Sequence, residues 1–118
     1  RRGNMIDIKR LERRILCNMR AAVRAKWRIG RSQGVGNADT LVCCALGSVG
    51  RDFIASYWND VDAISPREGI MKRLGITGCA YANIAMGCDG WAGTSHSPYA
   101  ALGRRLYEAS RAMIKWTS

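Results

Sequence analysis

Residues 65–115 read SPREGIMKRLGITGCAYANIAMGCDGWAGTSHSPYAALGRRLYEASRAMIK, and this stretch carries the helix start and stop signals that decide the predicted fold. Ser65, Pro66 and Glu68 match a capping box, in which the serine hydroxyl accepts a hydrogen bond from the backbone N–H of Glu68. Gly75 is a natural left-handed stop for that helix. The pattern therefore predicts one short helix between the serine and the glycine.

Two further helices follow in the same stretch. Thr77 is suited to cap a second helix over residues 78–86, which Gly87 would end. Ser97 and Pro98 then repeat the start signal of the first helix. In the third helix apolar residues recur at three- and four-residue spacing, at Tyr99, Leu102, Leu106, Ala109, Met113 and Ile114.

The order of these helices resembles the helix-turn-helix of the sigma-factor region 4 type, which small phage antitermination proteins of the Q type also use. The resemblance rests on Gly75-Ile76-Thr77, on Asn83-Ile84-Ala85-Met86-Gly87 and on a serine-initiated helix that carries Arg104-Arg105-Leu106. It covers fewer than half of the residues. The family joins its last two helices by a tight turn, whereas residues 88–96 separate them here.

The resemblance implies a helix-turn-helix-like unit over residues 65–116 that binds DNA near a promoter and engages RNA polymerase. It also implies two groups of contacts within the last helix. The residues nearest the base edges would be Ser97, Tyr99, Ala100 and Arg104. Those nearest the phosphates would be Arg105, Arg111 and Lys115.

Residues 6–28 form a predicted amphipathic helix with a basic back. Its apolar side carries Ile8, Leu11, Ile15, Met19, Ala22 and Val23. The opposite side carries Lys9, Arg10, Arg13, Arg14, Arg20, Arg24 and Arg28, and Arg31 follows. Glu12 projects toward the apolar side, where it is expected to pair with an arginine of the same molecule.

Positive charge is concentrated at the start of the chain. Residues 1–31 hold 11 basic and 2 acidic residues, so +9 of the formal net charge of +10 lies in this quarter. Such a face is expected to neutralise several phosphates and to bind a nucleic-acid backbone without regard to sequence. A merely solvated helix face and a membrane-surface helix are the alternatives, and the lack of bulky aromatic residues in the apolar stripe weakens the second.

Between the two helical regions, residues 30–37 form a predicted loop and residues 40–58 a buried core helix, capped by Asn37 or Asp39. A strand over residues 41–46 is a less favoured alternative because no pairing partner is evident. Residues 32–63 have a net charge of −3, which would suit docking on the basic helix.

Length and composition predict one compact, all-α domain of about five helices spanning the 118 residues, with residues 1–4 as a tail. No apolar run approaches the length of a membrane span. The five cysteines and the lack of a secretory signal predict a reducing cytoplasm, with Cys43 and Cys44 as buried thiols.

No residue pattern indicates an enzyme or a cofactor. The single histidine, His96, lies in a loop without a recognisable nucleophile pair. A metal-dependent nuclease would use Asp60, Asp62 and Glu68, and a zinc site would use Cys79, Cys88 and His96 with Cys17 or Cys43. Both are disfavoured, the second because the spacings are unlike those of compact zinc knuckles.

The sequence therefore predicts a DNA-binding transcription regulator, of the antitermination type if the resemblance holds. Its partners would be nucleic acid and RNA polymerase, and it would need no metal. The alternatives are an RNA-binding or ribonucleoprotein structural component and a small basic factor that binds an acidic protein.

Overall fold

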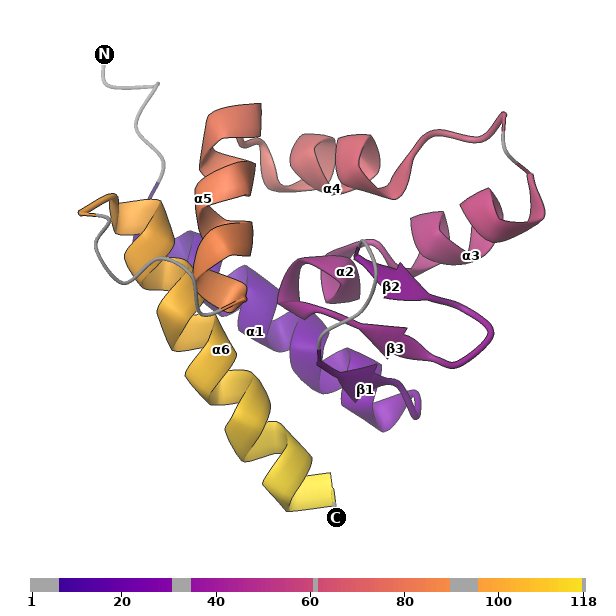
Figure 1. The fold of residues 1–118 in the computed structure, drawn as a ribbon, viewed down its shortest axis with the longest axis horizontal. Helices are drawn as coiled ribbons and strands as arrows, with labels where there is room; N and C mark the ends of the chain where they lie inside the picture. The colour runs from indigo at the N-terminus through magenta and orange to yellow at the C-terminus, as the bar shows by residue number, and fades with distance from the viewer. Residues whose placement is uncertain (1–6, 31–34, 61, 90–95, 118) are drawn as a thin grey trace.

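The computed structural model describes residues 7–30, 35–60, 62–89 and 96–117. The chain is mostly helical and folds as a single unit (Figure 1). The helices are α1 (Ile8–Arg24), α2 (Ala45–Val49), α3 (Arg51–Asn59), α4 (Pro66–Leu74), α5 (Gly78–Cys88) and α6 (Pro98–Thr117). The strands are β1 (Arg28–Ile29), β2 (Gly36–Asn37) and β3 (Val42–Cys43).

The helix α1 forms where the amphipathic pattern predicts it. The carboxylate of Asp7 accepts a hydrogen bond from the backbone N–H of Arg10 at 3.2 Å and so caps the first turn. The predicted apolar side is buried at Leu11, Ile15, Met19 and Ala22. The helix ends at Arg24 rather than at Arg28, because the chain turns at Lys26, which has a φ of 72°, and enters strand β1.

A small three-stranded sheet corrects the prediction of an all-α fold. Strand β3 lies in the middle, pairing in parallel with β1 and antiparallel with β2. The backbone N–H of Gly30 donates to the carbonyl of Cys43 at 2.9 Å, and the N–H of Cys44 donates to the carbonyl of Val35 at 3.1 Å. The predicted loop over residues 30–37 thus supplies the pairing partner that the sequence alone did not reveal.

The predicted core helix over residues 40–58 is also wrong as a single element, because β3, α2 and α3 divide it. Asn37 caps no helix: its side-chain oxygen accepts from the backbone N–H of Asp39 at 2.8 Å, which makes a turn. The thiol of Cys44 caps α2 instead. Gly50 ends α2, and a Cβ atom there would lie 2.6 Å from Cγ1 of Ile70, so glycine lets α4 pack against this break.

The helix starts and stops of the C-terminal half are largely confirmed. The hydroxyl of Ser65 accepts from the N–H of Glu68 at 3.3 Å, and that of Thr77 accepts from the N–H of Ala80 at 3.1 Å. Gly75 ends α4 in the left-handed conformation, with a φ of 68°. Gly87 does not end α5, which continues to Cys88.

Gly87 instead lets two helices meet. A Cβ atom on Gly87 would lie 2.7 Å from Cα of Gly103 in α6. The backbones of α5 and α6 therefore touch at this pair of glycines, as small residues at a helix crossing permit. The prediction that Gly87 stops the helix fails because glycine serves here in helix packing.

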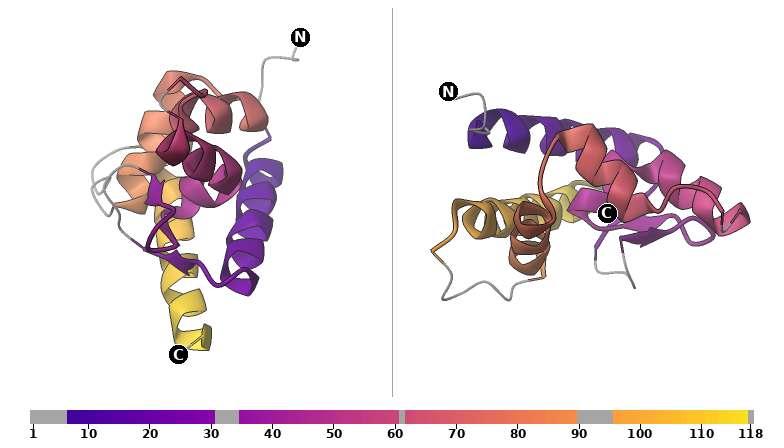
Figure 2. Two further views of the ribbon diagram at one scale, coloured as in Figure 1. Left: turned by 90° about the vertical axis from the view of Figure 1, so that its right-hand side faces the viewer. Right: turned by 90° about the horizontal axis from the view of Figure 1, so that it is seen from above.

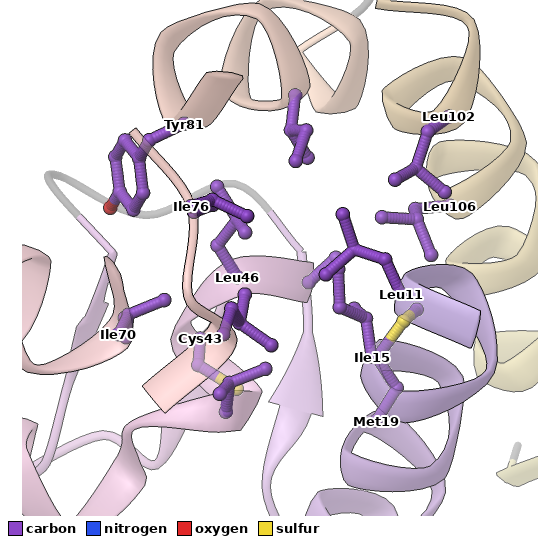
Figure 3. Packing of buried hydrophobic residues seen from close by; sticks show 14 of the residues in the cluster. Leu11, Ile15, Met19, Cys43, Leu46, Ile70, Ile76, Tyr81, Leu102 and Leu106 are labelled. Carbon is purple, nitrogen blue, oxygen red and sulfur yellow. The ribbon is translucent and has the colours of Figure 1, made fainter. Parts of the chain in front are cut away.

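The core lies between α1, α2, α5 and α6. All five residues of α2 are buried, which makes this short helix the centre of the molecule. Leu11, Ile15 and Met19 of α1 point toward Leu46 of α2 and toward α6 (Figure 3). The helix α1 forms one outer layer of the molecule, on the side away from the sheet (Figure 2). Its polar side therefore faces solvent.

Candidate nucleic-acid interface

Five basic side chains form the outward surface of α1, here called the basic face. It consists of Lys9, Arg10, Arg13, Arg20 and Arg24, all of which are exposed. At about 100° per residue these positions lie opposite the buried side of the helix. A helix of 17 residues is about 25 Å long, so the basic face presents cations along the full length of one rod.

The cations of the basic face are not neutralised by nearby acidic side chains of the described residues. Among the described residues, no carboxylate lies within ion-pair distance of any of its five cations. Exposed cations without acidic partners produce a positive potential that attracts polyanions and is screened by salt. Arg28, predicted to extend the same surface, is exposed on β1, and Arg31 lies outside the described residues.

An ion pair joins α1 to α6 on one flank of the basic face. Nη2 of Arg105 lies 3.0 Å from Oε1 of Glu12, and Nε of Arg105 also donates to this oxygen at 3.0 Å. The predicted pairing of Glu12 with an arginine is confirmed. The pair brings Arg105, a predicted phosphate contact, to the edge of α1.

The other flank meets the end of α4. Arg14 of α1 donates from Nη2 to the backbone carbonyl of Arg73 at 2.6 Å. The Arg73 guanidinium in turn donates to both oxygens of Asp52, at 2.8 and 3.0 Å, and to the carbonyl of Val49 at 3.0 Å. It also lies over the ring of Phe53, 4.3 Å from the ring centroid.

The hydrogen-bonded pair of Arg73 and Asp52, here called the clamp, shifts the pKa of both side chains. Hydrogen bonds from the guanidinium hold the pKa of the Asp52 carboxyl below its ordinary value. The same bonds raise the pKa of Arg73. The clamp ties α4 to the start of α3, and sequence reasoning missed it because no local pattern links residues 21 positions apart.

The other predicted contacts on α6 are spread around the helix. Ser97 is partly buried, and its hydroxyl accepts from the N–H of Tyr99 at 3.2 Å, which caps α6. Tyr99 packs against the core cluster. Ala100 is completely buried, so the prediction that it contacts a base is wrong. The side chain of Lys115 lies outside the described part of the chain.

The arginines of α6 occupy different flanks of the helix. Arg105 lies beside α1, whereas Arg111 lines a hollow formed with Ile29 and the end of α5. Arg104 precedes Arg111 by seven residues, or about two turns, and therefore shares its flank. The structure thus joins Arg105 to the basic face but places Arg104 and Arg111 about 100° away around the helix.

The cysteines do not form a metal site among the residues that the structure places. No group of three His, Cys, Asp or Glu side chains there could hold a metal ion. Cys43 is buried, as predicted, and burial raises the pKa of its thiol to about 12. Burial also raises the pKa of Cys44 and of Cys88. These thiols are therefore neutral packing groups at physiological pH.

None of the helices in the described ranges combines the length and the apolar character needed to cross a membrane. Comparison of the chain with protein families, with curated proteins and with solved structures finds no match. The candidate interface is therefore argued from the chemistry and the geometry of its own residues.

Proposed function

We propose that the protein binds nucleic acid, with duplex DNA as the favoured ligand, by laying the basic face of α1 along the phosphate backbone. One observation carries this proposal: five exposed cations line a single helix and have no acidic partner among the described residues. Cations at this density displace the counterions of phosphates, which favours binding at low salt. The protein acts by contact rather than by catalysis.

The resemblance to sigma-factor region 4 suggests a biological role for this binding. By this resemblance, α5 and α6 are the helices that read DNA, and the protein is a cytoplasmic transcription regulator of the antitermination type that engages RNA polymerase. Support comes from the close approach of Gly87 to Gly103, which holds α6 firmly against α5. Further support comes from the ion pair of Arg105 with Glu12, which holds the first half of α6 beside the basic face.

Salt dependence is the first test of the proposal. The affinity for a short duplex is measured by fluorescence anisotropy at several salt concentrations. With about five to seven phosphates engaged, a plot of log affinity against log salt should have a slope of roughly −4 to −6. A slope near zero would contradict binding through the phosphate backbone.

Charge reversal on the basic face is the second test. The double variant Arg13→Glu, Arg20→Glu should bind cognate and random duplexes much more weakly and reduce the salt slope by about two. The matched control is Arg67→Glu, Lys72→Glu, which makes the same change in net charge at exposed positions of α4. Equal losses in the two double variants would show that only net charge matters, not the basic face.

A third test separates backbone contact from sequence reading. Arg105→Ala leaves Glu12 unpaired beside the basic face, so it should weaken binding to all sequences alike. Arg104→Ala should instead change the preference between sequences enriched from a random duplex pool and random DNA. Equal loss on both kinds of DNA for Arg104→Ala would remove the reading role. Preferential competition by structured RNA would assign the basic face to RNA.

A further inference from the structure

A cavity of about 670 Å³ lies between β2, α3, the start of α4 and α5. Figure 1 labels these four elements, and none of the described lining residues belongs to α1 or α6. Its volume falls within the range of about 300–1,000 Å³ that is typical of small-molecule sites. The apolar part of its wall includes Val35, Leu46, Ile54, Pro66, Ala85 and the rings of Tyr57 and Tyr81.

One cation marks this cavity. Arg67 lines it from the first turn of α4, and its guanidinium carbon lies 5.3 Å from the centroid of the Tyr81 ring. Within the described ranges no carboxylate lies close enough to Arg67 to form an ion pair. A cation held over an aromatic ring at an apolar cavity is suited to pair with an anionic group of a ligand.

The remaining polar groups of the wall favour a ligand with a single negative charge. Burial raises the pKa of Cys44, Cys88 and Tyr81, so these groups are neutral and do not repel an anion. Asp89 is the one carboxylate among the described lining residues, and it disfavours a second negative charge on the ligand.

One exposed aromatic side chain lines the cavity, and an exposed aliphatic side chain is next in sequence to another lining residue. Tyr57 lines the cavity and is 41% exposed, and Ile64, which directly precedes the lining residue Ser65, is 37% exposed. They are two of the four large hydrophobic residues found exposed among those described. A ligand bound in the cavity would remove this apolar surface from water, which favours binding.

We propose that this cavity binds a small organic monoanion, whose ring-bearing apolar body packs on Leu46, Ile54 and Tyr57 and whose carboxylate or sulfonate pairs with Arg67. The site is separate from the basic face and does not depend on nucleic-acid binding. It would take aromatic acids in preference to neutral molecules of the same shape, because only the acid uses the cation.

Two fluorescent probes with the same ring system test the proposal. 1-Anilinonaphthalene-8-sulfonate carries an anionic group, whereas N-phenyl-1-naphthylamine lacks it. Titration of the full chain should show saturable binding of the sulfonate at one site. Arg67→Met should weaken sulfonate binding about tenfold and leave the neutral probe unchanged. The control Lys72→Met removes an exposed cation of the same helix outside the cavity and should change neither affinity by more than about twofold.

A second pair of variants tests the space rather than the charge. Ala85→Phe places a ring inside the cavity and should abolish binding of both probes. Ala82→Phe, at an exposed position of the same helix, should leave the binding of both probes unchanged. Circular dichroism verifies that each variant is folded. Equal effects of Arg67→Met and Lys72→Met on the sulfonate would overturn the proposal, as would unsaturable binding or binding at several sites. Because Arg67 and Lys72 are surface residues, this comparison remains decisive if Ala85→Phe unfolds the protein.

Discussion

A single added methyl group at the crossing of α5 and α6 tests the packing that positions α6. A Cβ atom on Gly103 would lie 2.8 Å from Cα of Gly87 and 3.0 Å from the backbone N of Cys88, and closer still to the carbonyl oxygen of Ile84. All three are backbone atoms, so the clash cannot be relieved by a rotamer change. One helix must move away from the other.

The expected size of the effect follows from two opposed contributions. Overpacking of this kind costs about 1–3 kcal/mol. The higher helix propensity of alanine returns up to about 1 kcal/mol. We therefore expect Gly103→Ala to lower the free energy of unfolding by about 1–2 kcal/mol, equivalent to a decrease in Tm of about 3–8 °C for a domain of this size.

Urea denaturation followed by far-ultraviolet circular dichroism measures this difference. The matched control is Gly78→Ala in the first turn of α5, where the nearest atoms to an added Cβ lie 3.7 Å away. This control should be within about 0.5 kcal/mol of the wild type or slightly more stable. If Gly103→Ala were as stable as Gly78→Ala, the two helices would not touch at the glycine pair, and the packing of α6 described above would be wrong.

Two further predictions concern ionisable side chains. Because hydrogen bonds from Arg73 hold the pKa of Asp52 below its ordinary value of 3.8, the clamp stabilises the protein above that pH and is lost as the pH falls below it. Asp52→Asn should thus cost less than about 1 kcal/mol at pH 6, since the pair is largely exposed, and the difference should vanish in acid when unfolding is measured across pH. An aromatic disulfide reagent should modify the exposed Cys17 and Cys79 rapidly in the native protein, while Cys43, whose pKa burial raises to about 12, should react only on unfolding. Peptide mapping identifies the modified thiols, and rapid native labelling of Cys43 would contradict its burial.

The features that the sequence predicted well depend on neighbours within three or four residues. The caps at Ser65 and Thr77 and the stop at Gly75 require only a side chain and the adjacent backbone, so the residue types suffice. The basic face was predictable for the same reason, because helical periodicity alone separates its cations from the buried positions of α1.

The features that the sequence did not predict depend on contacts between distant segments. Strand β3 forms because β1 and β2 come to lie on either side of it, and two-residue strands carry too little pattern to predict their pairing. Gly87 has the residue type of a helix stop but faces Gly103 in another helix, and residue type alone cannot separate these roles. Glu12 was expected to find an arginine, yet the partner lies 93 positions away.

The position of Arg105 bears on which arginines of α6 could contact a duplex that is bound along α1. Its ion pair with Glu12 neutralises a negative charge on the flank of the basic face and brings a cation of α6 to the edge of that surface. Arg104 and Arg111 lie on a different flank, so a rigid duplex lying flat along α1 meets Arg105 first. A ligand that reaches Arg104 as well must bend around α6 or tilt away from α1. On the proposed function, α1 and Arg105 contact the phosphate backbone together, and sequence reading by Arg104 would in addition require bent or tilted DNA.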